Sequence, residues 1–341
     1  MKRLIGGLCA FTALMMIVFL GLGFAQSLHP AFDSFSHFRI AILVPLVAFV
    51  PVLWITNRKP IALASAIVSI ITLIVTLPYL PGMKRGYALD KQTQSWNRIS
   101  VLQLNMRFNN TDTQSIISAL KSAPSDILLL QELTATTSLA IPAFAKSHPH
   151  QLNCFTANVG SVAILSRFPF AQDKPTSCER FEGFARATLQ VGPRQISVAS
   201  YHSRWPWPAG QRQQIERLTP EFNKLNTEYS ILAGDFNAAP WSQAIKTIVD
   251  KTGLQVLTGL EFTWAPRLKS SRTISKHFRG VPDSVKNIQF PEWFVSLQNN
   301  IGPLLPIDQI LYSAKFSPHT REVLQDAGSD HYPVRTVFVW K

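Results

Sequence analysis

Three long apolar runs with few charged residues occupy residues 1–82 of the chain. They extend from about Leu4 to Ala25, from Ile40 to Thr56 and from Ile61 to about Pro81. A helix that spans a bilayer needs roughly 20 apolar residues, with about 17 as the lower limit, so the second run is only just long enough. The pattern predicts a membrane anchor of three transmembrane helices over residues 1–82. The alternative is two spanning helices behind a cleaved signal peptide.

The positions of Lys and Arg around these runs predict their orientation. Lys2 and Arg3 precede the first run and Arg58 and Lys59 separate the second from the third, whereas residues 26–38 contain neither Lys nor Arg. Short loops rich in Lys and Arg remain in the cytoplasm. We therefore expect a multi-pass protein of the cell inner membrane, with everything after the third run outside the cytoplasm, in the periplasm.

A polar segment and a long soluble segment follow the anchor. Residues 83–98 are polar and aperiodic, so we interpret them as a linker; Lys84 and Arg85 within it weigh against the predicted orientation. Over residues 99–341, short β-type runs alternate with helical patterns, and runs such as DILLL and YSILA are continuously apolar. Such runs are typical of strands covered on both faces. The pattern predicts one α/β domain of stacked sheets flanked by helices.

The expected elements of this domain are short. Strands are predicted near residues 99–106, 126–130, 160–166, 184–191, 195–202, 229–235, 307–313 and 333–339, and helices near 113–122, 209–225 and 241–250.

The charge balance points to anionic partners. The chain carries 33 Lys and Arg against 20 Asp and Glu, a net charge of +13. Residues 90–341 hold 26 of the basic and 19 of the acidic residues, so the soluble part alone has a charge of +7. A basic domain favours nucleic acid, phosphorylated small molecules or anionic lipid headgroups. The alternative is a cationic surface that only keeps the protein soluble.

Polar side chains stand abruptly at the ends of the apolar strands, where the active sites of layered α/β proteins collect. Each one alone also fits a helix cap, a turn or a surface residue. Together they supply four carboxylates, two histidines and two asparagines, and they contain no Ser or Cys nucleophile pattern. The residues are Asn105, Gln131, Glu132, His202, Asp235, Asn237, Asp308, Asp330 and His331.

This set of side chains suits the hydrolysis of a phosphate ester. A hard divalent cation prefers carboxylate and amide oxygens, and Mg²⁺ uses only one or two protein carboxylates. In-line attack on phosphorus needs an oriented water, a group that takes its proton, and donors around the phosphoryl oxygens. We therefore expect a metal-dependent phosphoesterase with Mg²⁺ as its cofactor, or Mn²⁺ in its place.

The motifs, taken in order, resemble those of the endonuclease/exonuclease/phosphatase superfamily over about residues 99–340. The resemblance implies an α/β fold of the DNase I-like type, a four-layered α/β/β/α sandwich with its site at one rim. It is specific for fold and reaction type but not for substrate. The motifs are Asn105, the Gln131-Glu132 pair, GSVAILSRFP, His202, Gly234-Asp-Phe-Asn237, Thr263-Trp264, Ile307-Asp308 and Ser329-Asp-His331.

The resemblance implies which residues hold metal and substrate. Glu132 is the principal metal ligand, Asn105 lies beside it, and Asp330 completes the ligand sphere. Arg186, in the segment FARATL, occupies a place where basic residues that contact phosphate occur in the superfamily.

The resemblance also implies the catalytic roles. Asp235 orients or deprotonates the attacking water, and Asn237 holds the phosphate or that water. His331, paired with Asp308, contacts the scissile phosphoryl group. His202 acts toward the leaving group or the charge of the transition state.

Three features depart from the superfamily pattern. Gln309 follows Asp308 where many members carry His, Tyr or Trp. His202 stands where abasic-site endonucleases have a tyrosine, which weakens a DNA-repair assignment. Residues 265–305 form a long connection with basic and aromatic segments, which is either a tolerated surface insertion or a flap that binds nucleic acid or a membrane surface.

The sequence therefore predicts a membrane-anchored phosphodiesterase that acts on an anionic phosphate ester, either nucleic acid or a lipid headgroup, without an obligate protein partner. The alternatives are a phosphomonoesterase and an inactive binding module of the same fold.

Two cysteines remain outside the apolar runs, Cys154 and Cys178. In an extracytoplasmic domain they can form a disulfide, provided that their Cα atoms lie within about 7 Å of each other. We predict this bond; the alternative is two unrelated thiols.

Overall fold

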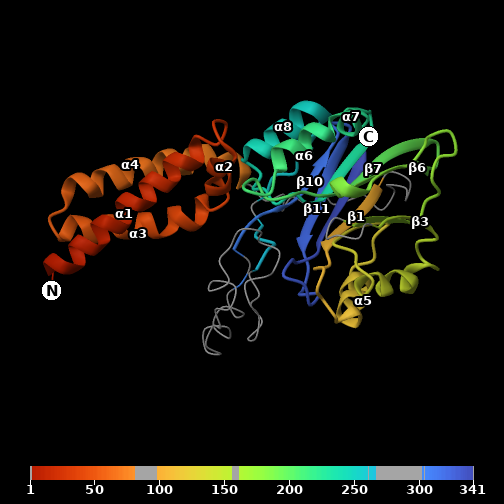
Figure 1. Ribbon diagram of the computed structural model, residues 1–341, viewed down its shortest axis with the longest axis horizontal. Coiled ribbons are helices and arrows are strands. Elements are labelled where there is room, and N and C mark those ends of the chain that lie inside the picture. The colour runs from red at the N-terminus through yellow and green to blue at the C-terminus, as the bar shows by residue number, and fades with distance from the viewer. Residues whose placement is uncertain are drawn as a thin grey trace.

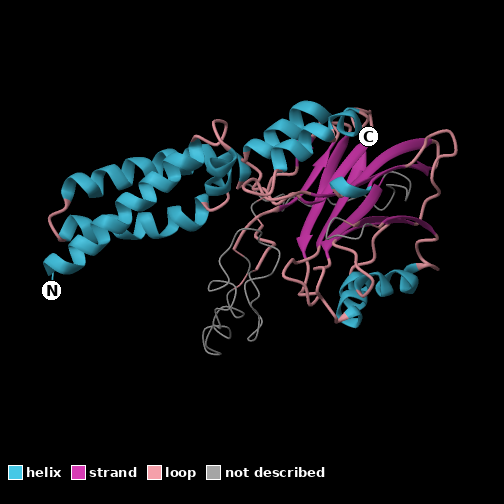
Figure 2. Ribbon diagram, viewed as in Figure 1, coloured by secondary structure: helices cyan, strands magenta, loops and turns pink. Residues whose placement is uncertain are grey.

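The computed structural model describes residues 2–80, 98–155, 161–259, 261–265, 302 and 304–340. Nearly all of the predicted linker and the basic and aromatic segments of the 265–305 connection lie outside these residues. The described chain consists of an elongated helical bundle followed by a domain of strands and helices (Figures 1 and 2).

The bundle contains the three apolar runs. Its long helices are α1 (Lys2–Phe24), α3 (Arg39–Ile55) and α4 (Lys59–Thr76), and α4 continues into the 3-10 helix η1 (Leu77–Tyr79). Small residues of α1 allow close packing: a Cβ atom on Gly6 would lie 2.7 Å from the Cβ atom of Thr56. The larger apolar side chains of the three helices are mostly exposed on the outside of the bundle.

Two of these helices are long and apolar enough to cross a membrane, Lys2–Phe24 and Lys59–Tyr79. A third span exists only if α2 (Pro30–Ser36) and α3 are counted as one, and these two helices meet at an angle of 58°. α3 alone has 17 residues and contains Pro45 and Pro51. In place of the three predicted transmembrane helices, the described residues therefore contain two candidate spans, or three if the bent pair is one span.

The α/β domain is built on two sheets, as the sequence predicts, and each has six strands. The first sheet has the order β11 (Phe316–Val323), β12 (Val334–Trp340), β1 (Arg98–Asn105), β2 (Ile127–Gln131), β4 (Val162–Ser166) and β3 (His150–Cys154). The second has the order β5 (Ser177–Glu179), β6 (Phe184–Val191), β7 (Arg194–His202), β8 (Ser230–Asp235), β10 (Asp308–Tyr312) and β9 (Gln255–Val256). The edge strands β3, β5, β9 and β11 were not predicted.

Successive residues of a strand point to opposite faces of its sheet. Each central strand therefore contributes apolar side chains to two layers, one on either face of the sheet. Alternate residues of the central strands, such as Val101, Ile164, Ala187 and Ile231, form the core between the sheets. The other faces are covered by helices. α5 (Thr113–Ser122) and the 3-10 helix η3 (Thr137–Phe144) pack on the first sheet, and α6 (Gln211–Arg217), α7 (Thr219–Asn223) and α8 (Gln243–Thr252) on the second. This is the sandwich arrangement that the motifs imply.

The predicted disulfide is present. Cys154 and Cys178 are bonded with their Cα atoms 5.6 Å apart. Cys154 ends β3 and Cys178 lies in β5, the edge strands of the two different sheets. The bond therefore ties the two layers of the sandwich together at one edge.

Removal of this bond should destabilise the domain. The bond closes a loop with a sequence separation of 24, and on the chain-entropy model the loss of such a loop costs about 3 kcal/mol. We expect a Cys154→Ala/Cys178→Ala double variant to unfold at a clearly lower temperature than the parent protein. Cys9→Ala, which removes the free cysteine of the bundle, is the control. Equal melting temperatures for the parent and the double variant would contradict the prediction.

The bundle is docked onto the α/β domain through α2. The carboxylate of Asp33 accepts the backbone N–H groups of Gln243 at 3.0 Å and Ala244 at 3.2 Å, which are the first two residues of α8. Negative charge is stabilising at this end of a helix, where N–H groups lack intrahelical partners. Figure 1 shows α2 between the bundle and the helices α6 and α8.

A buried tryptophan strengthens the same contact. Trp241 donates from Nε1 to the carbonyl oxygen of Ser36 at 2.7 Å, and its own carbonyl oxygen accepts Nε2 of Gln26 at 3.0 Å. The backbone N–H of Ala239 donates to Nδ1 of His37 at 3.4 Å. The loop after β8 is thus held by the bundle.

Candidate active site

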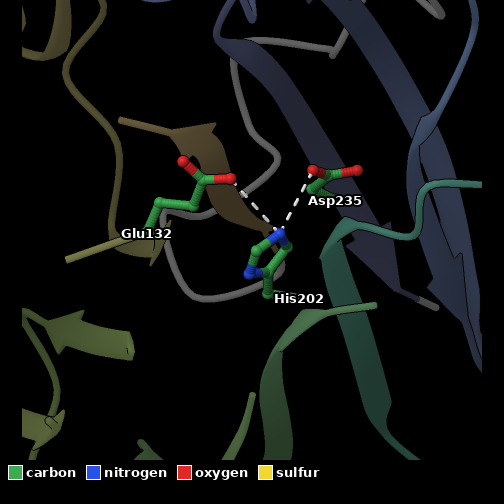
Figure 3. A group of neighbouring side chains, drawn as sticks. All are labelled: Glu132, His202 and Asp235. Atoms are coloured by element: carbon green, nitrogen blue, oxygen red, sulfur yellow. Dashed lines mark ion pairs between the residues drawn. The ribbon is translucent and has the colours of Figure 1, made fainter. Parts of the chain in front are cut away.

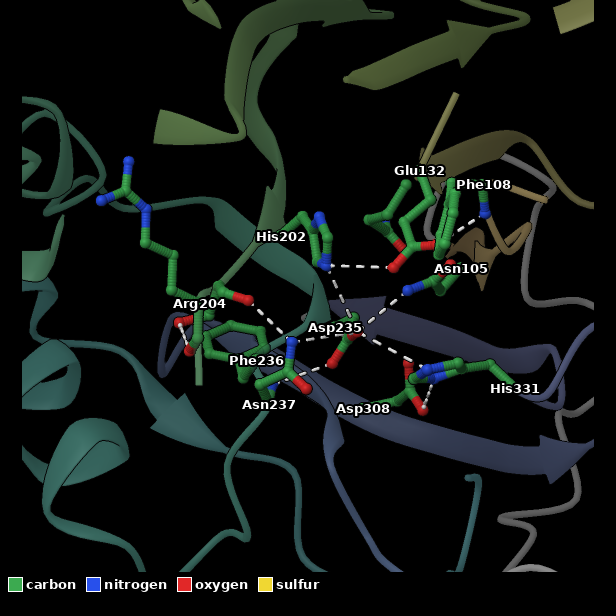
Figure 4. Close-up of polar contacts among 12 residues, drawn as sticks. Asn105, Phe108, Glu132, His202, Arg204, Asp235, Phe236, Asn237, Asp308 and His331 are labelled. Carbon is green, nitrogen blue, oxygen red and sulfur yellow. Dashed lines mark hydrogen bonds and ion pairs between the residues drawn. The ribbon is translucent and has the colours of Figure 1, made fainter. Parts of the chain in front are cut away.

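The pairing of the strands brings five polar side chains to one edge of the two sheets. β1 runs parallel to β2, and Asn105 is opposite the last residue of β2, so Glu132 follows at the same edge. β7 runs parallel to β8 with His202 opposite Asp235, and the antiparallel β10 begins with Asp308, also opposite Asp235. The side chains converge from both sheets (Figure 4).

Glu132 faces His202 across this edge (Figure 3). Oε1 of Glu132 lies 3.4 Å from Nε2 of His202, and Oε2 accepts the backbone N–H of Phe108 at 2.7 Å. Glu132 has a φ of 56°, a left-handed conformation that costs about 1–3 kcal/mol for a non-glycine residue. This backbone turn at the end of β2 directs the carboxylate back toward the other strand ends.

Asp235 lies at the centre of the group and is 1% exposed. Oδ1 accepts the backbone N–H of Asn237 at 2.8 Å and Oδ2 accepts Nδ2 of Asn105 at 2.9 Å. Oδ2 also lies 3.6 Å from Nε2 of His202 and 3.6 Å from Nε2 of His331. Burial raises the pKa of Asp235 to about 6, although the charge of His331 opposes this rise.

His331 and Asp308 form a buried, hydrogen-bonded pair. Nδ1 of His331 lies 2.9 Å from Oδ2 of Asp308, and both residues are almost fully buried. Burial lowers the pKa of His331, but the carboxylates of Asp308 and Asp235 outweigh it and hold the pKa well above its usual value. The backbone N–H of Tyr332 donates to the carbonyl oxygen of Thr263, which fixes this segment. The pair is arranged to keep a cationic histidine beside Asp235.

The backbone around Asp235 allows the close approach of β7 and β8. A Cβ atom on Gly234 would lie 2.0 Å from the carbonyl oxygen of Tyr201, so only glycine fits there. Asn237 adopts a φ of 46°. Its Nδ2 donates to the carbonyl oxygen of Ser203 at 2.7 Å and reaches Oδ2 of Asp235 at 3.3 Å.

A cleft of about 1110 Å³ opens over these residues. Six of the predicted residues line it, whereas Asn105 and Asp308 are buried behind them. The six are Glu132, His202, Asp235, Asn237, Asp330 and His331.

The model of the endonuclease/exonuclease/phosphatase family matches residues 102–331, well over half of the chain. The chain belongs to this family. The matched region begins in β1 and ends at His331, so it contains every strand end described above. None of the curated proteins matches the chain.

Solved structures of several proteins of this fold resemble the family member described here. Sphingomyelinase C from Streptomyces griseocarneus is 16% identical with a TM-score of 0.43, over 70% of this chain and 99% of the other. A beta toxin variant from Staphylococcus aureus with bound magnesium ions is 12% identical with a TM-score of 0.44, over 71% and 99%. TDP2 from D. rerio complexed with a single-strand DNA product is 15% identical with a TM-score of 0.47, over 71% and 98%. At these identities the substrates of those proteins do not transfer to this chain.

Among the described residues, two groups of side chains place three ligand atoms within 4.8 Å of one another. The first, Glu132, His202 and Asp235, lines the cleft. In the second, His331 is already bonded to Asp308. Oxygen donors at the cleft fit a hard cation such as Mg²⁺; in the first group these are the carboxylates of Glu132 and Asp235, and Glu132 is the one that also lies beside the backbone N–H of Phe108 and away from the Asp308–His331 pair.

The other two predicted metal ligands are Asn105 and Asp330. Nδ2 of Asn105 is bonded to Asp235, and Oδ1 accepts the backbone N–H of Arg107 at 2.9 Å; a carbonyl oxygen accepts two bonds, so one lone pair remains. Asp330 lines the cleft, and its Oδ2 lies 3.8 Å from Nε of Arg107. Asp330 therefore lines the same cleft as Glu132, whereas Asn105 is buried behind it.

Arg186 does not line the cleft either, and it lies on another face of its sheet. It lies in β6 between Ala185 and Ala187, whose side chains point into the core between the sheets. Its own side chain therefore points to the helix layer, where Nε lies 3.3 Å from Oε2 of Glu221. This buried ion pair joins α7 to the sheet, so the structure gives no support for Arg186 as a substrate-binding residue.

Other residues near the site were not predicted from the sequence. Arg180 and Arg204 line the cleft; the segment SRWPWP, directly after the predicted strand end at His202, was the available signal for Arg204. Gln309, noted as a departure from the superfamily pattern, donates from Nε2 to the carbonyl oxygens of Ala238 at 2.9 Å and Pro306 at 2.6 Å. Gln309 therefore holds the backbone of the loop after Asn237 by a hydrogen bond.

Proposed function

We propose that this protein is a membrane-anchored, divalent-metal-dependent phosphodiesterase that hydrolyses its substrate by in-line attack of water. The observation that carries the proposal is the position of Asp235. It is a buried carboxylate whose pKa burial raises to about 6, it lies 3.6 Å from each of two histidines, and it shares the cleft with Glu132.

The proposed reaction begins with a water bound beside Asp235. The ionised carboxylate takes a proton from this water while the oxygen of the water forms a bond to phosphorus. Asn237, which Ser203 holds in place, positions the phosphate or the water. The cationic His331, held by Asp308, donates a hydrogen bond to a phosphoryl oxygen and stabilises the charge that develops there.

The reaction ends with departure of the alcohol. The bond between phosphorus and the leaving oxygen breaks on the side opposite the water, and His202 gives a proton to that oxygen. The products are a phosphomonoester and an alcohol. Glu132, with Asn105 and Asp330 beside it, would hold the Mg²⁺ ion, which supplies Lewis acidity toward the phosphoryl oxygens.

We further infer that the bundle is the membrane anchor. Its outward-facing side chains are apolar, as in Leu8 (67% exposed) and Ile74 (62% exposed), a surface that water does not favour. The basic pairs at Lys2 and at Arg58 lie at the end of the bundle away from α2, so the α/β domain is on the extracytoplasmic side. A disulfide between Cys154 and Cys178 suits that compartment.

The proposal is tested with the full-length protein in detergent. We expect hydrolysis of bis-p-nitrophenyl phosphate to require Mg²⁺ or Mn²⁺, and hydrolysis of p-nitrophenyl phosphate to be slower. Preference for the monoester would make the protein a phosphomonoesterase. A folded protein that hydrolyses neither substrate at any metal concentration would be a binding module, and the proposal would be wrong.

The pH dependence of kcat should follow the ionisation of Asp235. A general base must be ionised, and the pKa of Asp235 is raised to about 6, so kcat should fall about tenfold per pH unit below that value. A cation near Glu132 favours the ionised form, so more Mg²⁺ should move this fall to lower pH. The measurement is a kcat profile at several Mg²⁺ concentrations. A rate that stays constant down to pH 4 would exclude Asp235 as the base.

A further inference from the structure

One side of the cleft is lined by aromatic and basic side chains. Arg180 and Phe181 belong to the short 3-10 helix η4 (Arg180–Glu182), and Arg204 and Trp205 to the loop after β7. Nη2 of Arg204 donates to the carbonyl oxygen of Phe181 at 3.2 Å, which joins the two segments. Phe181 is 80% exposed, and Trp207, in the same loop, is 57% exposed. We call this surface the aromatic rim; it comprises Arg180, Phe181, Arg204, Trp205 and Trp207.

The aromatic rim lies against the end of the helical bundle. The ring of Trp205 is 5.9 Å from the ring of His37, between centroids. Nη2 of Arg212 donates to the carbonyl oxygen of Ser27 at 3.3 Å, and a small groove is lined by residues of both parts, including Pro206 and Asp33. Trp207 follows Pro206 directly, so the exposed end of the loop is close to the bundle.

This end of the bundle has the features of a membrane–water boundary. α1 ends and α3 begins there, and Phe24, Leu28 and Phe38 are exposed around it. Tryptophan side chains favour the headgroup level of a bilayer, and arginine forms strong, charge-assisted hydrogen bonds with phosphate. Nη2 of Arg204 also lies 3.6 Å from Oε2 of Glu182, so the aromatic side chains and Arg180 are the part of this surface that suits a layer of phosphate headgroups.

We propose that the aromatic rim faces the bilayer that holds the anchor, and that the cleft accepts the phosphodiester headgroup of a lipid in that bilayer. The proposal rests on the proposed phosphodiesterase activity and on the anchoring. Water adds to the lipid phosphorus and a bond from phosphorus to an ester oxygen breaks, so one product is a phosphomonoester and the other an alcohol. The bundle favours a lipid over a long polynucleotide, which would have to continue past the cleft on the side that α2 and the bundle occupy.

The test compares two substrates of the full-length protein reconstituted in bilayers. One set of bilayers contains phosphatidylethanolamine and phosphatidylglycerol, and a second contains phosphatidylcholine and sphingomyelin. Phosphorus NMR follows conversion of the lipid diester to a monoester, and bis-p-nitrophenyl phosphate measures the chemistry on a soluble diester. We expect lipid turnover in at least one set.

The variants are Trp207→Ala and Phe181→Ala. Both side chains are exposed, so the fold should tolerate their loss. We expect the ratio of lipid turnover to soluble-diester turnover to fall roughly tenfold in each, the equivalent of about 1.4 kcal/mol. Leu139→Ala is the control, because Leu139 is 67% exposed but lies on η3, over the other sheet; it should not move the ratio.

The outcomes separate this inference from the proposed function. Hydrolysis of the soluble diester without any lipid turnover would overturn the lipid substrate and leave the phosphodiesterase intact. An unchanged ratio in both rim variants would overturn the role of the aromatic rim. Cleavage of single-stranded DNA that depends on Trp207 while lipid is untouched would make the rim a base-stacking surface. Failure on every substrate would refute the phosphodiesterase itself.

Discussion

Glu132→Gln is expected to lower the turnover of a phosphodiester at least 10²-fold and to weaken Mg²⁺ binding on the order of 10-fold or more. The substitution keeps the volume of the side chain, and the amide oxygen can still accept the N–H of Phe108. It removes the negative charge of Glu132 and places an amide group where a carboxylate oxygen lies 3.4 Å from Nε2 of His202. The fold should remain intact while the metal loses its main anchor.

The experiment measures kcat against Mg²⁺ concentration, with the melting temperature as the check on folding. Glu228→Gln is the matched control, since the Glu228 side chain is 62% exposed and its ion-pair partner is Lys315. The control should retain full activity at all Mg²⁺ concentrations. Near-normal turnover by Glu132→Gln at low Mg²⁺ would remove Glu132 from the mechanism.

The Asp308–His331 pair should behave as one unit. Loss of either member is expected to reduce kcat roughly 10²–10⁴-fold, the range of a single acid–base group. Without Asp308, the pKa of His331 loses its strongest raising influence and burial dominates, so the imidazolium is no longer maintained. Without His331, Asp308 has no role in the reaction. Removal of both should therefore cost little more than removal of one.

The measurement is a double-mutant cycle with Asp308→Asn, His331→Gln and the double variant. The melting temperatures of all three identify any loss that comes from unfolding. A second readout is the alkaline limb of the pH profile. In Asp308→Asn this limb should shift to lower pH than in the parent, because the pKa of His331 falls. Rate losses that multiply in the double variant would contradict the coupling.

Much of the site could be predicted because strand patterns are local. Apolar runs that end in Asn105, Glu132, His202 and Asp235 predict strands with polar ends, and parallel pairing of β1 with β2 and of β7 with β8 brings those ends to one edge. The disulfide could also be proposed from the sequence. Its partners, however, proved to be edge strands of different sheets, because β5 pairs with β6 and not with β4.

The remaining features depend on tertiary contacts that no local pattern encodes. Arg186 is a basic residue of the kind that binds phosphate, but the sequence does not show to which face of the sheet its side chain points. Only the packing of α7 shows that it faces Glu221. Residues 26–38 read as a plain loop between spans. Their role in docking depends on Asp33 meeting the start of α8, more than 200 positions later in the sequence.

The most direct test of the central claim is the metal dependence of phosphodiester hydrolysis by the full-length protein. The protein is stripped with a chelator and assayed with bis-p-nitrophenyl phosphate as Mg²⁺ is added back. We expect a rate near background without metal and a saturable recovery with Mg²⁺, with p-nitrophenyl phosphate and p-nitrophenol formed in equal amounts. Hydrolysis that proceeds unchanged without divalent metal, or a folded protein that stays inactive at every Mg²⁺ concentration, would contradict the central claim.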